Sequence, residues 1–174
     1  MRQALLLAAC LATLPGAASA QAPDRPDIVR GLCSKDGCDE FQIVGKTPIA
    51  TGADGQLFRT QVRTFHASSG GRAAGGDEAG YVFCSATRPA ILSAPAGRPP
   101  VAVYLAPDDR SPDWVLRGSA NFTALYFALC HGVDAGRAAL RDRAGEARAL
   151  GYHVALETPR TVTLGRVEDV LKPQ

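Results

Sequence analysis

The spacing of apolar residues predicts an amphipathic helix over Ser119–Gly132. Its large apolar side chains are Phe122, Leu125, Tyr126, Leu129 and Cys130. These positions follow the i, i+3, i+4, i+7, i+8 spacing of one helical face. Gly132 suits the left-handed turn that commonly follows a helix. We therefore expect a sheet to pack on this face and Cys130 to tie the two layers together.

Two further helices are predicted around this one. Ser111-Pro112-Asp113 has the residue types of a helix start, and the short helix that follows would carry Trp114 and Leu116 and end near Gly118. On the other side, Asp134 is placed to cap a helix over Arg137–Leu150, whose apolar stripe consists of small residues.

Strands are predicted where apolar residues alternate with polar ones or form short uncharged runs. The predicted strands begin at Phe41–Val44 and continue with Gln56–His66, Gly80–Ser85, Val101–Leu105, Tyr152–Leu156 and Thr161–Leu164. Pro48 predicts an edge position or a break after the first of them. Ala53-Asp54-Gly55 predicts a hairpin turn, and the glycine-rich Ala67–Ala79 a flexible hairpin loop.

The longest predicted strand has two different faces. The face that carries Phe58, Thr60, Val62, Thr64 and His66 is the better core candidate. In Gly80–Ser85, Val82 shares a face with Cys84, and Tyr81 with Phe83, so both faces of that strand are expected to be covered.

The order of elements indicates the fold class. Strands come first, helices follow, and the chain then returns to strand and ends in a helical turn at Arg166–Leu171. This order predicts an α+β fold, in which an antiparallel sheet of about four to six strands is packed by two main helices. We expect one domain over residues 33–174.

The N-terminal residues 1–20 have the pattern of a cleaved signal peptide. Arg2 precedes an apolar run at Ala4–Leu14, and Ala18-Ser19-Ala20 is a typical cleavage site. The protein is therefore expected to be periplasmic or secreted, with residues 21–32 as a flexible leader. In an alternative interpretation, Leu7-Ala8-Ala9-Cys10 is a lipoprotein cleavage box that places a lipid on Cys10.

Four cysteines remain after the predicted cleavage: Cys33, Cys38, Cys84 and Cys130. An even number in an exported chain favours disulfide bonds over free thiols. Four cysteines allow three connectivities. We favour Cys33–Cys38 with Cys84–Cys130, because the turn-forming Asp36-Gly37 lets the first pair close a tight loop.

The charge pattern argues against two classes of partner. The formal net charge is +2, and the basic residues are scattered along the chain rather than gathered in a stripe. A nucleic-acid surface or an acidic-membrane surface is therefore not expected. The one apolar run, in the signal peptide, is too short for a transmembrane segment.

The candidates for chemistry are three histidines, His66, His131 and His153, together with Cys130 and Cys84. A nucleophilic cysteine needs a base within hydrogen-bond reach. Adjacent residues on a helix point about 100° apart, so His131 is poorly placed to activate Cys130. We therefore interpret Cys130 as a disulfide partner and His131 as a helix-end residue. The spacing of the histidines matches no short metal-ligand motif, and no cofactor or metal site is assigned.

Three segments carry a resemblance: GYVFCSATRPAIL, NFTALYFALCHG and GYHVAL. Together they resemble a group of uncharacterised small exported proteins of Gram-negative bacteria, over residues 33–170. The resemblance implies export and a frame built through Cys84 and Cys130. It implies no activity.

The sequence thus leads to two functional hypotheses. The favoured one is a non-enzymatic binding or interaction module of the cell envelope, with an envelope protein or a small ligand as its partner. The alternative is a hydrolase or thiol-dependent enzyme that uses Cys130 or Cys84 with a histidine.

Overall fold

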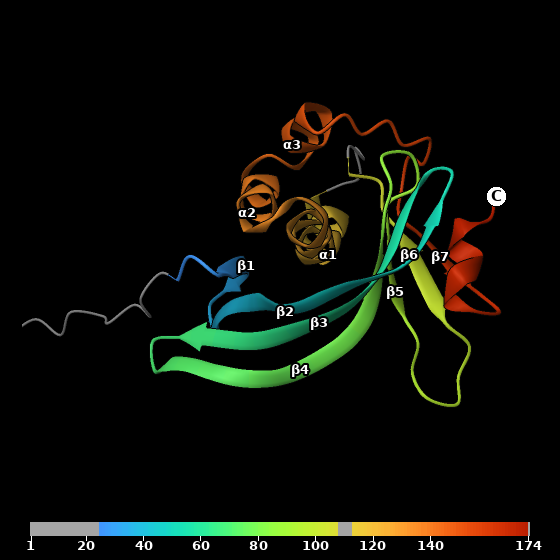
Figure 1. The fold of residues 1–174 in the computed structure, drawn as a ribbon. Coiled ribbons are helices and arrows are strands. Elements are labelled where there is room, and N and C mark those ends of the chain that lie inside the picture. The colour runs from blue at the N-terminus through green and yellow to red at the C-terminus, as the bar shows by residue number, and fades with distance from the viewer. Residues whose placement is uncertain (1–24, 108–112, 174) are drawn as a thin grey trace, which may run out of the picture.

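A single antiparallel meander forms the frame of the protein (Figure 1). The computed structural model describes residues 25–107 and 113–173. In this part of the chain, seven strands pair in sequence order, each with the next. Their bounds are β1 (Ile28–Ser34), β2 (Gly37–Gly52), β3 (Gly55–Ser68), β4 (Gly71–Cys84), β5 (Ala90–Ser93), β6 (Val101–Tyr104) and β7 (Arg160–Thr163). The α+β prediction is confirmed, but seven strands exceed the expected four to six.

The additional strands come from segments whose sequence signal was weak. Residues 21–32 were expected to be a flexible leader, yet β1 begins at Ile28, and Ile28 and Val29 are buried in the core. The four-residue β5 was not predicted at all. In contrast, Tyr152–Leu156 is not a strand. The ring of Tyr152 packs against Phe127 instead, and the outer neighbour of β6 is β7.

The glycine-rich stretch Ala67–Ala79 is the clearest error of the sequence prediction. It is not a loop, because β3 continues to Ser68 and β4 begins at Gly71. Backbone pairing needs no large side chain, and Arg63 joins Asp77 across the two strands with an Nε–Oδ1 distance of 2.6 Å. The predicted hairpin turn at Ala53-Asp54-Gly55 is confirmed, since β2 ends at Gly52 and β3 starts at Gly55.

Pro48 lies within β2 rather than beyond its end. Strand β1 pairs with β2 only as far as Gln42, so the part of β2 that contains Pro48 is an edge, and the register shifts between Pro48 and Ala50. A proline at an edge costs no ladder hydrogen bond on its outer side. The predicted edge position is therefore confirmed.

Three α-helices separate β6 from β7. Helix α1 (Asp113–His131) is continuous, so the predicted helix end near Gly118 is wrong. The residues Ser111 and Pro112, and the side chains of Trp114 and Leu116, lie outside the described part. The predicted helix over Arg137–Leu150 is divided into α2 (Val133–Arg141) and α3 (Arg143–Ala149).

Asp142 explains the division between α2 and α3. Its side chain accepts a hydrogen bond from the backbone N–H of Gly145 at 2.8 Å, which makes it the N-cap of α3. Asp134, the predicted cap, lies in the first turn of α2 and makes no capping hydrogen bond there.

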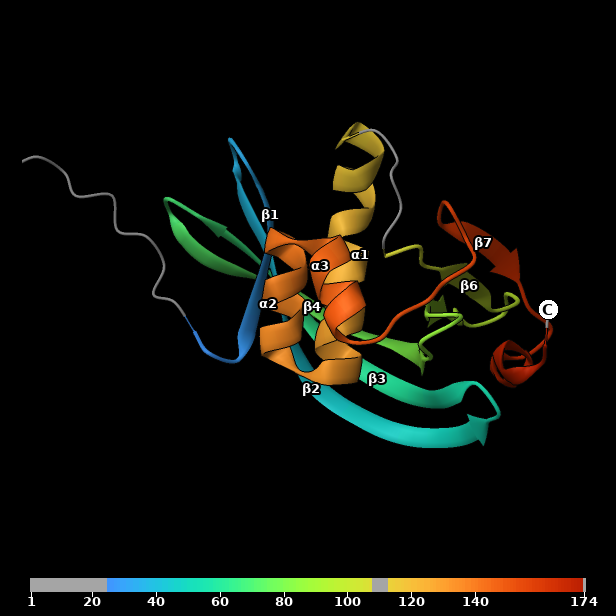
Figure 2. The same cartoon turned by 90° about the horizontal axis from the view of Figure 1, so that it is seen from above.

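The helices cover one face of the sheet, and the long strands β2–β4 curve around α1 (Figures 1 and 2). One apolar cluster occupies part of the space between this concave face and the helices; it includes Val82 and Phe127. A second cluster lies on the opposite face and includes Phe83. It also contains Val170 of the 3-10 helix η1 (Val167–Leu171), close to the predicted terminal turn. Both faces of β4 are therefore covered at Val82 and Phe83, as predicted for Gly80–Ser85.

Two disulfides join the favoured pairs of cysteines. Cys33 and Cys38 face each other across β1 and β2, and Cys84 at the end of β4 is bonded to Cys130 on α1. The second bond crosses from the sheet to the helix layer. No helix within residues 25–107 and 113–173 is both long enough and apolar enough to cross a membrane.

Glu40 is a buried carboxylate of β2 that lies between two arginines. Its side chain is 0% exposed; Arg30 Nε lies 2.8 Å from Oε1, and Arg72 Nε lies 2.5 Å from Oε2. Burial alone would raise the pKa of Glu40, but the hydrogen bonds from Arg72 and Arg30 outweigh it and hold the pKa below its ordinary value. This ionised cluster joins β1, β2 and β4.

The substitution Glu40→Gln should lower the free energy of unfolding at pH 7 by about 3 kcal/mol, because it removes the buried carboxylate charge with which Arg72 and Arg30 pair. A group whose pKa is depressed by folding stabilises the protein above its unfolded pKa, here near 4.5, and loses that effect as the pH falls through the folded value. Denaturant titrations of the wild type should show this loss, and those of the variant should not.

Asp77→Asn is the matched control, since Asp77 forms an ion pair with Arg63 that is partly exposed to solvent. Its cost should stay below about 1 kcal/mol. Equal costs for the two variants would contradict the assigned role of Glu40.

Candidate functional site

The cysteine candidates for catalysis are bonded to each other. The Sγ atoms of Cys84 and Cys130 form a disulfide, so neither sulfur is a thiolate in this structure. A cysteine acts as a nucleophile only as the thiolate. The two residues therefore act here as a structural link between β4 and α1.

His66 lies on β3 and is held by the β1–β2 turn and β2. Its Nε2 lies 3.0 Å from the carbonyl oxygen of Asp36, and its Nδ1 lies 3.5 Å from Oδ1 of Asp39. The hydrogen bond with the Asp36 carbonyl and that with the Asp39 carboxylate both favour the protonated ring and raise the pKa of His66.

His131 begins a chain of hydrogen bonds that runs into the core. Its Nε2 lies 2.7 Å from the hydroxyl of Tyr152, which donates to the hydroxyl of Tyr126 at 3.0 Å. The Tyr126 hydroxyl in turn donates to the carbonyl oxygen of Ser85. Burial, followed by the nearby charge of Lys46, lowers the pKa of His131. The chain fixes the end of α1 to the residue after Cys84.

His153 has a third, separate set of neighbours. Its Nδ1 lies 3.0 Å from the carbonyl oxygen of Gly151, and its backbone N–H donates to the carbonyl of Ala86. The three histidines thus have different partners, namely carbonyls, a carboxylate and a phenol. Within the described ranges, no group of three or more His, Cys, Asp or Glu side chains could hold a metal ion.

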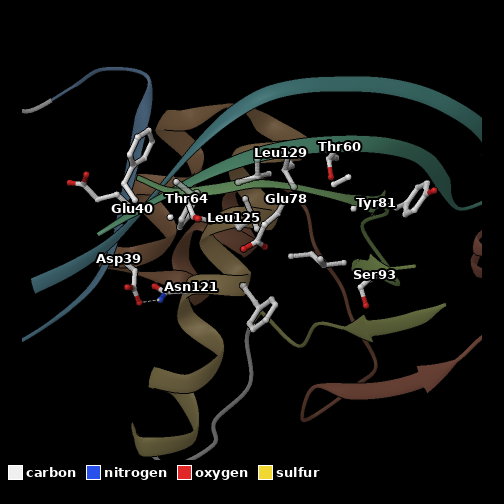
Figure 3. A pocket seen from close by; sticks show the side chains of 18 of the residues that line it. Asp39, Glu40, Thr60, Thr64, Glu78, Tyr81, Ser93, Asn121, Leu125 and Leu129 are labelled. Atoms are coloured by element: carbon white, nitrogen blue, oxygen red, sulfur yellow. Dashed lines mark hydrogen bonds between the residues drawn. The ribbon is translucent and has the colours of Figure 1, made fainter. Parts of the chain in front are cut away.

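A cavity of about 700 Å³ lies between α1 and the concave face of the sheet (Figure 3). Its apolar wall includes Val62 of β3, Ile91 of β5, Val103 of β6, and Phe122, Leu125 and Leu129 of α1. His66 and Asp39 lie at its wall, whereas His131, His153 and the Cys84–Cys130 disulfide do not.

The helical stripe predicted as core is divided between two roles. Tyr126 is fully buried, while Leu125 and Leu129 line the cavity and Phe122 remains 47% exposed at its wall. The predicted core face of β3 behaves in the same way, because Thr60, Val62 and Thr64 also line the cavity. The sequence pattern predicted the correct faces but gave no sign that they stand apart.

Two features keep this space open. Strand β5 pairs with β4 only at Tyr81, Val82 and Phe83 and then departs, so the earlier part of β4 has no outer neighbour within the described residues. This part of β4 carries small cavity-lining residues, namely Ala73, Ala74, Gly75, Ala79 and Gly80. Side chains of this size leave unfilled the volume that larger residues would occupy.

The polar side chains at the cavity wall differ in whether they have a hydrogen-bond or ion-pair partner. Asp39 faces His66 and accepts a hydrogen bond from Asn121 at 3.4 Å. Thr60 is 5% exposed, and its hydroxyl has no hydrogen-bond partner among the described residues. Glu78, which pairs in register with Val62, is exposed and has no ion-pair partner among them. Figure 3 shows the side chains of Thr60 and Glu78 at the wall.

The cavity is the site that the sequence did not predict. The sequence features that indicate it are the large apolar Phe122 at the end of the helical stripe and the threonines on the cavity-lining face of β3.

The chain matches no protein-family model, no curated protein and no solved structure.

The environments of His66 and His131 should be separable by titration. Because its hydrogen bonds favour the protonated ring, the pKa of His66 should lie above its ordinary value of 6.5, and because desolvation and the nearby charge of Lys46 disfavour the protonated ring, the pKa of His131 should lie below it. NMR of the imidazole Cε1–H signals against pH measures both midpoints, with His66→Gln and His131→Gln for assignment. The reverse order would contradict the placement of both side chains.

Proposed function

We propose that the protein is an exported, non-enzymatic binding protein of the cell envelope, and that the cavity between α1 and the sheet holds an apolar molecule. The observation that carries the proposal is the cavity itself. Its volume of about 700 Å³ falls in the range typical of ligand sites. Its wall is mainly aliphatic and aromatic, with few polar groups, which is also typical of such sites.

The rigidity of the wall supports binding without a large ordering cost. The C-terminal part of α1 is fixed to β4 by Cys84–Cys130, and Lys46 Nζ donates to the carbonyl of Leu129 at 2.6 Å. A site held in its binding shape loses little conformational entropy when a ligand enters.

Export is supported by the cysteines and by the N-terminal sequence. Cys33, Cys38, Cys84 and Cys130 are all in disulfides, and disulfides are typical of oxidising compartments. Residues 1–20 lie outside the described part, so the signal peptide and the alternative lipid on Cys10 both stay predictions from sequence. A periplasmic or secreted location fits both observations.

The enzyme hypothesis has less support. It requires Cys130 or Cys84 to act with a histidine, but the two sulfurs are bonded to each other, and the three histidines have separate partners. A hydrolase or thiol enzyme would gain support only from a measured turnover that depends on one of these residues.

The proposal predicts saturable binding of a neutral apolar probe, N-phenyl-1-naphthylamine, with a rise in its fluorescence. Leu125→Trp places a larger side chain at the cavity wall and should weaken binding at least tenfold. Ile49→Trp adds the same side chain at an exposed site on β2 away from the cavity and should leave the affinity unchanged. Circular dichroism checks that both variants fold.

Two results would contradict this proposal. One is no saturable binding of the probe to the wild type. The other is equal affinity in Leu125→Trp and in the wild type, since this would place the bound probe elsewhere.

A further inference from the structure

The carboxylates at the cavity wall differ in whether they have a cationic partner. Four residues of its wall can carry a charge: Asp39, Glu40, His66 and Glu78. Glu40 is neutralised by Arg30 and Arg72, and Asp39 faces the imidazole of His66. Glu78 alone has no ion-pair partner among the described residues. The Glu78 carboxylate is therefore a negative charge of the wall that no described cation pairs with.

Neighbouring cations do not remove this charge. On β3, Arg63 is paired with Asp77. Asp77 precedes Glu78 in β4, so the side chains of these two residues point to opposite faces of the sheet. On β2, the ammonium of Lys46 is held by the Leu129 carbonyl and lies 4.1 Å from the centre of the Phe58 ring. Neither group forms an ion pair with Glu78.

A second polar group lies near Glu78 on the same face. In the β3–β4 register, Thr60 is opposite Gly80, and Val62 is opposite Glu78. Thr60 and Glu78 are thus diagonal neighbours, a relation that places backbone positions about 7–8 Å apart. The Thr60 hydroxyl is buried without a partner in the described chain, and a buried polar group without a hydrogen bond is costly. A ligand group placed between them can satisfy both.

We propose, building on the binding function above, that the ligand is a cationic amphiphile: an apolar body with an ammonium or similar group. The apolar body lies along Leu125, Leu129 and Val103, and the cationic group donates hydrogen bonds to the Glu78 carboxylate and the Thr60 hydroxyl. An ammonium has only donors, which complements these two acceptors. A carboxylate head group in the same place would face Glu78 with like charge.

Three molecules with the same alkyl chain test this selectivity. Dodecylamine and dodecanoate, each below its critical micelle concentration, and dodecanol, below its solubility limit, compete with N-phenyl-1-naphthylamine for the wild-type protein at pH 7. Dodecylamine should compete at least tenfold better than dodecanol, and dodecanoate should compete least. Added NaCl should reduce the advantage of the amine, since part of it is electrostatic.

Glu78→Gln assigns the charge effect to one side chain. This variant should lose the preference for the amine and bind dodecylamine and dodecanol equally. Asp77→Asn is the matched control, because it removes one negative charge from the adjacent residue on the opposite face, and it should keep the full preference for the amine. Thr60→Val should weaken dodecylamine binding severalfold.

The outcomes separate the two proposals. Probe binding that Leu125→Trp weakens, but without a preference for the amine, would overturn the cationic ligand and leave the binding function standing. A preference that persists in Glu78→Gln, or a preference for dodecanoate, would do the same. Absence of probe binding would overturn both proposals.

Discussion

The Cys84–Cys130 disulfide is the link on which the arrangement of helix and sheet depends. It joins the end of β4 to the end of α1, and the hydrogen bonds between Tyr126 and Ser85 lie directly beside it. In the loop-closure account, a cross-link over 46 residues lowers the entropy of the unfolded chain and thereby raises the free energy of unfolding by roughly 4 kcal/mol. Its position also has a geometric consequence. One end of α1 is fixed against the sheet, while the residues from Phe122 to Leu129 span a space that the sheet curves around.

Two other parts of the structure allow the cavity between α1 and the sheet to stay open. On the face of the sheet away from the helices, the second apolar cluster holds the strands together without any contribution from α1, and the Glu40 carboxylate between Arg30 and Arg72 joins β1, β2 and β4. Above the sheet, α2 and α3 pack against α1 and close the first cluster. The concave face can therefore leave part of its surface uncovered, because the strands do not depend on α1 at every position for their stability.

Much of the fold could be predicted from local patterns, but the cavity could not. Periodicity identified the α1 stripe and the faces of β3, and the cysteine count with the Asp36-Gly37 turn identified both disulfides. The sequence prediction failed at Ala67–Ala79. Glycine and alanine can pair as strand when a partner strand is present, and local composition does not reveal that partner. The prediction also treated Leu125 as core. An apolar residue at a cavity wall has the same sequence signal as one in the core, and only the path of β5 away from β4 separates the two.

The most direct test of the account is a crystal structure of the protein grown with dodecylamine. The account predicts an alkyl chain between α1 and the concave face of β3 and β4, with its nitrogen within hydrogen-bond distance of the Glu78 carboxylate. It also predicts an intact Cys84–Cys130 disulfide and little movement of α1. A cavity closed by a shift of α1 onto β3, or an alkyl chain bound elsewhere, would contradict the claim that the sheet and helix form a standing binding site.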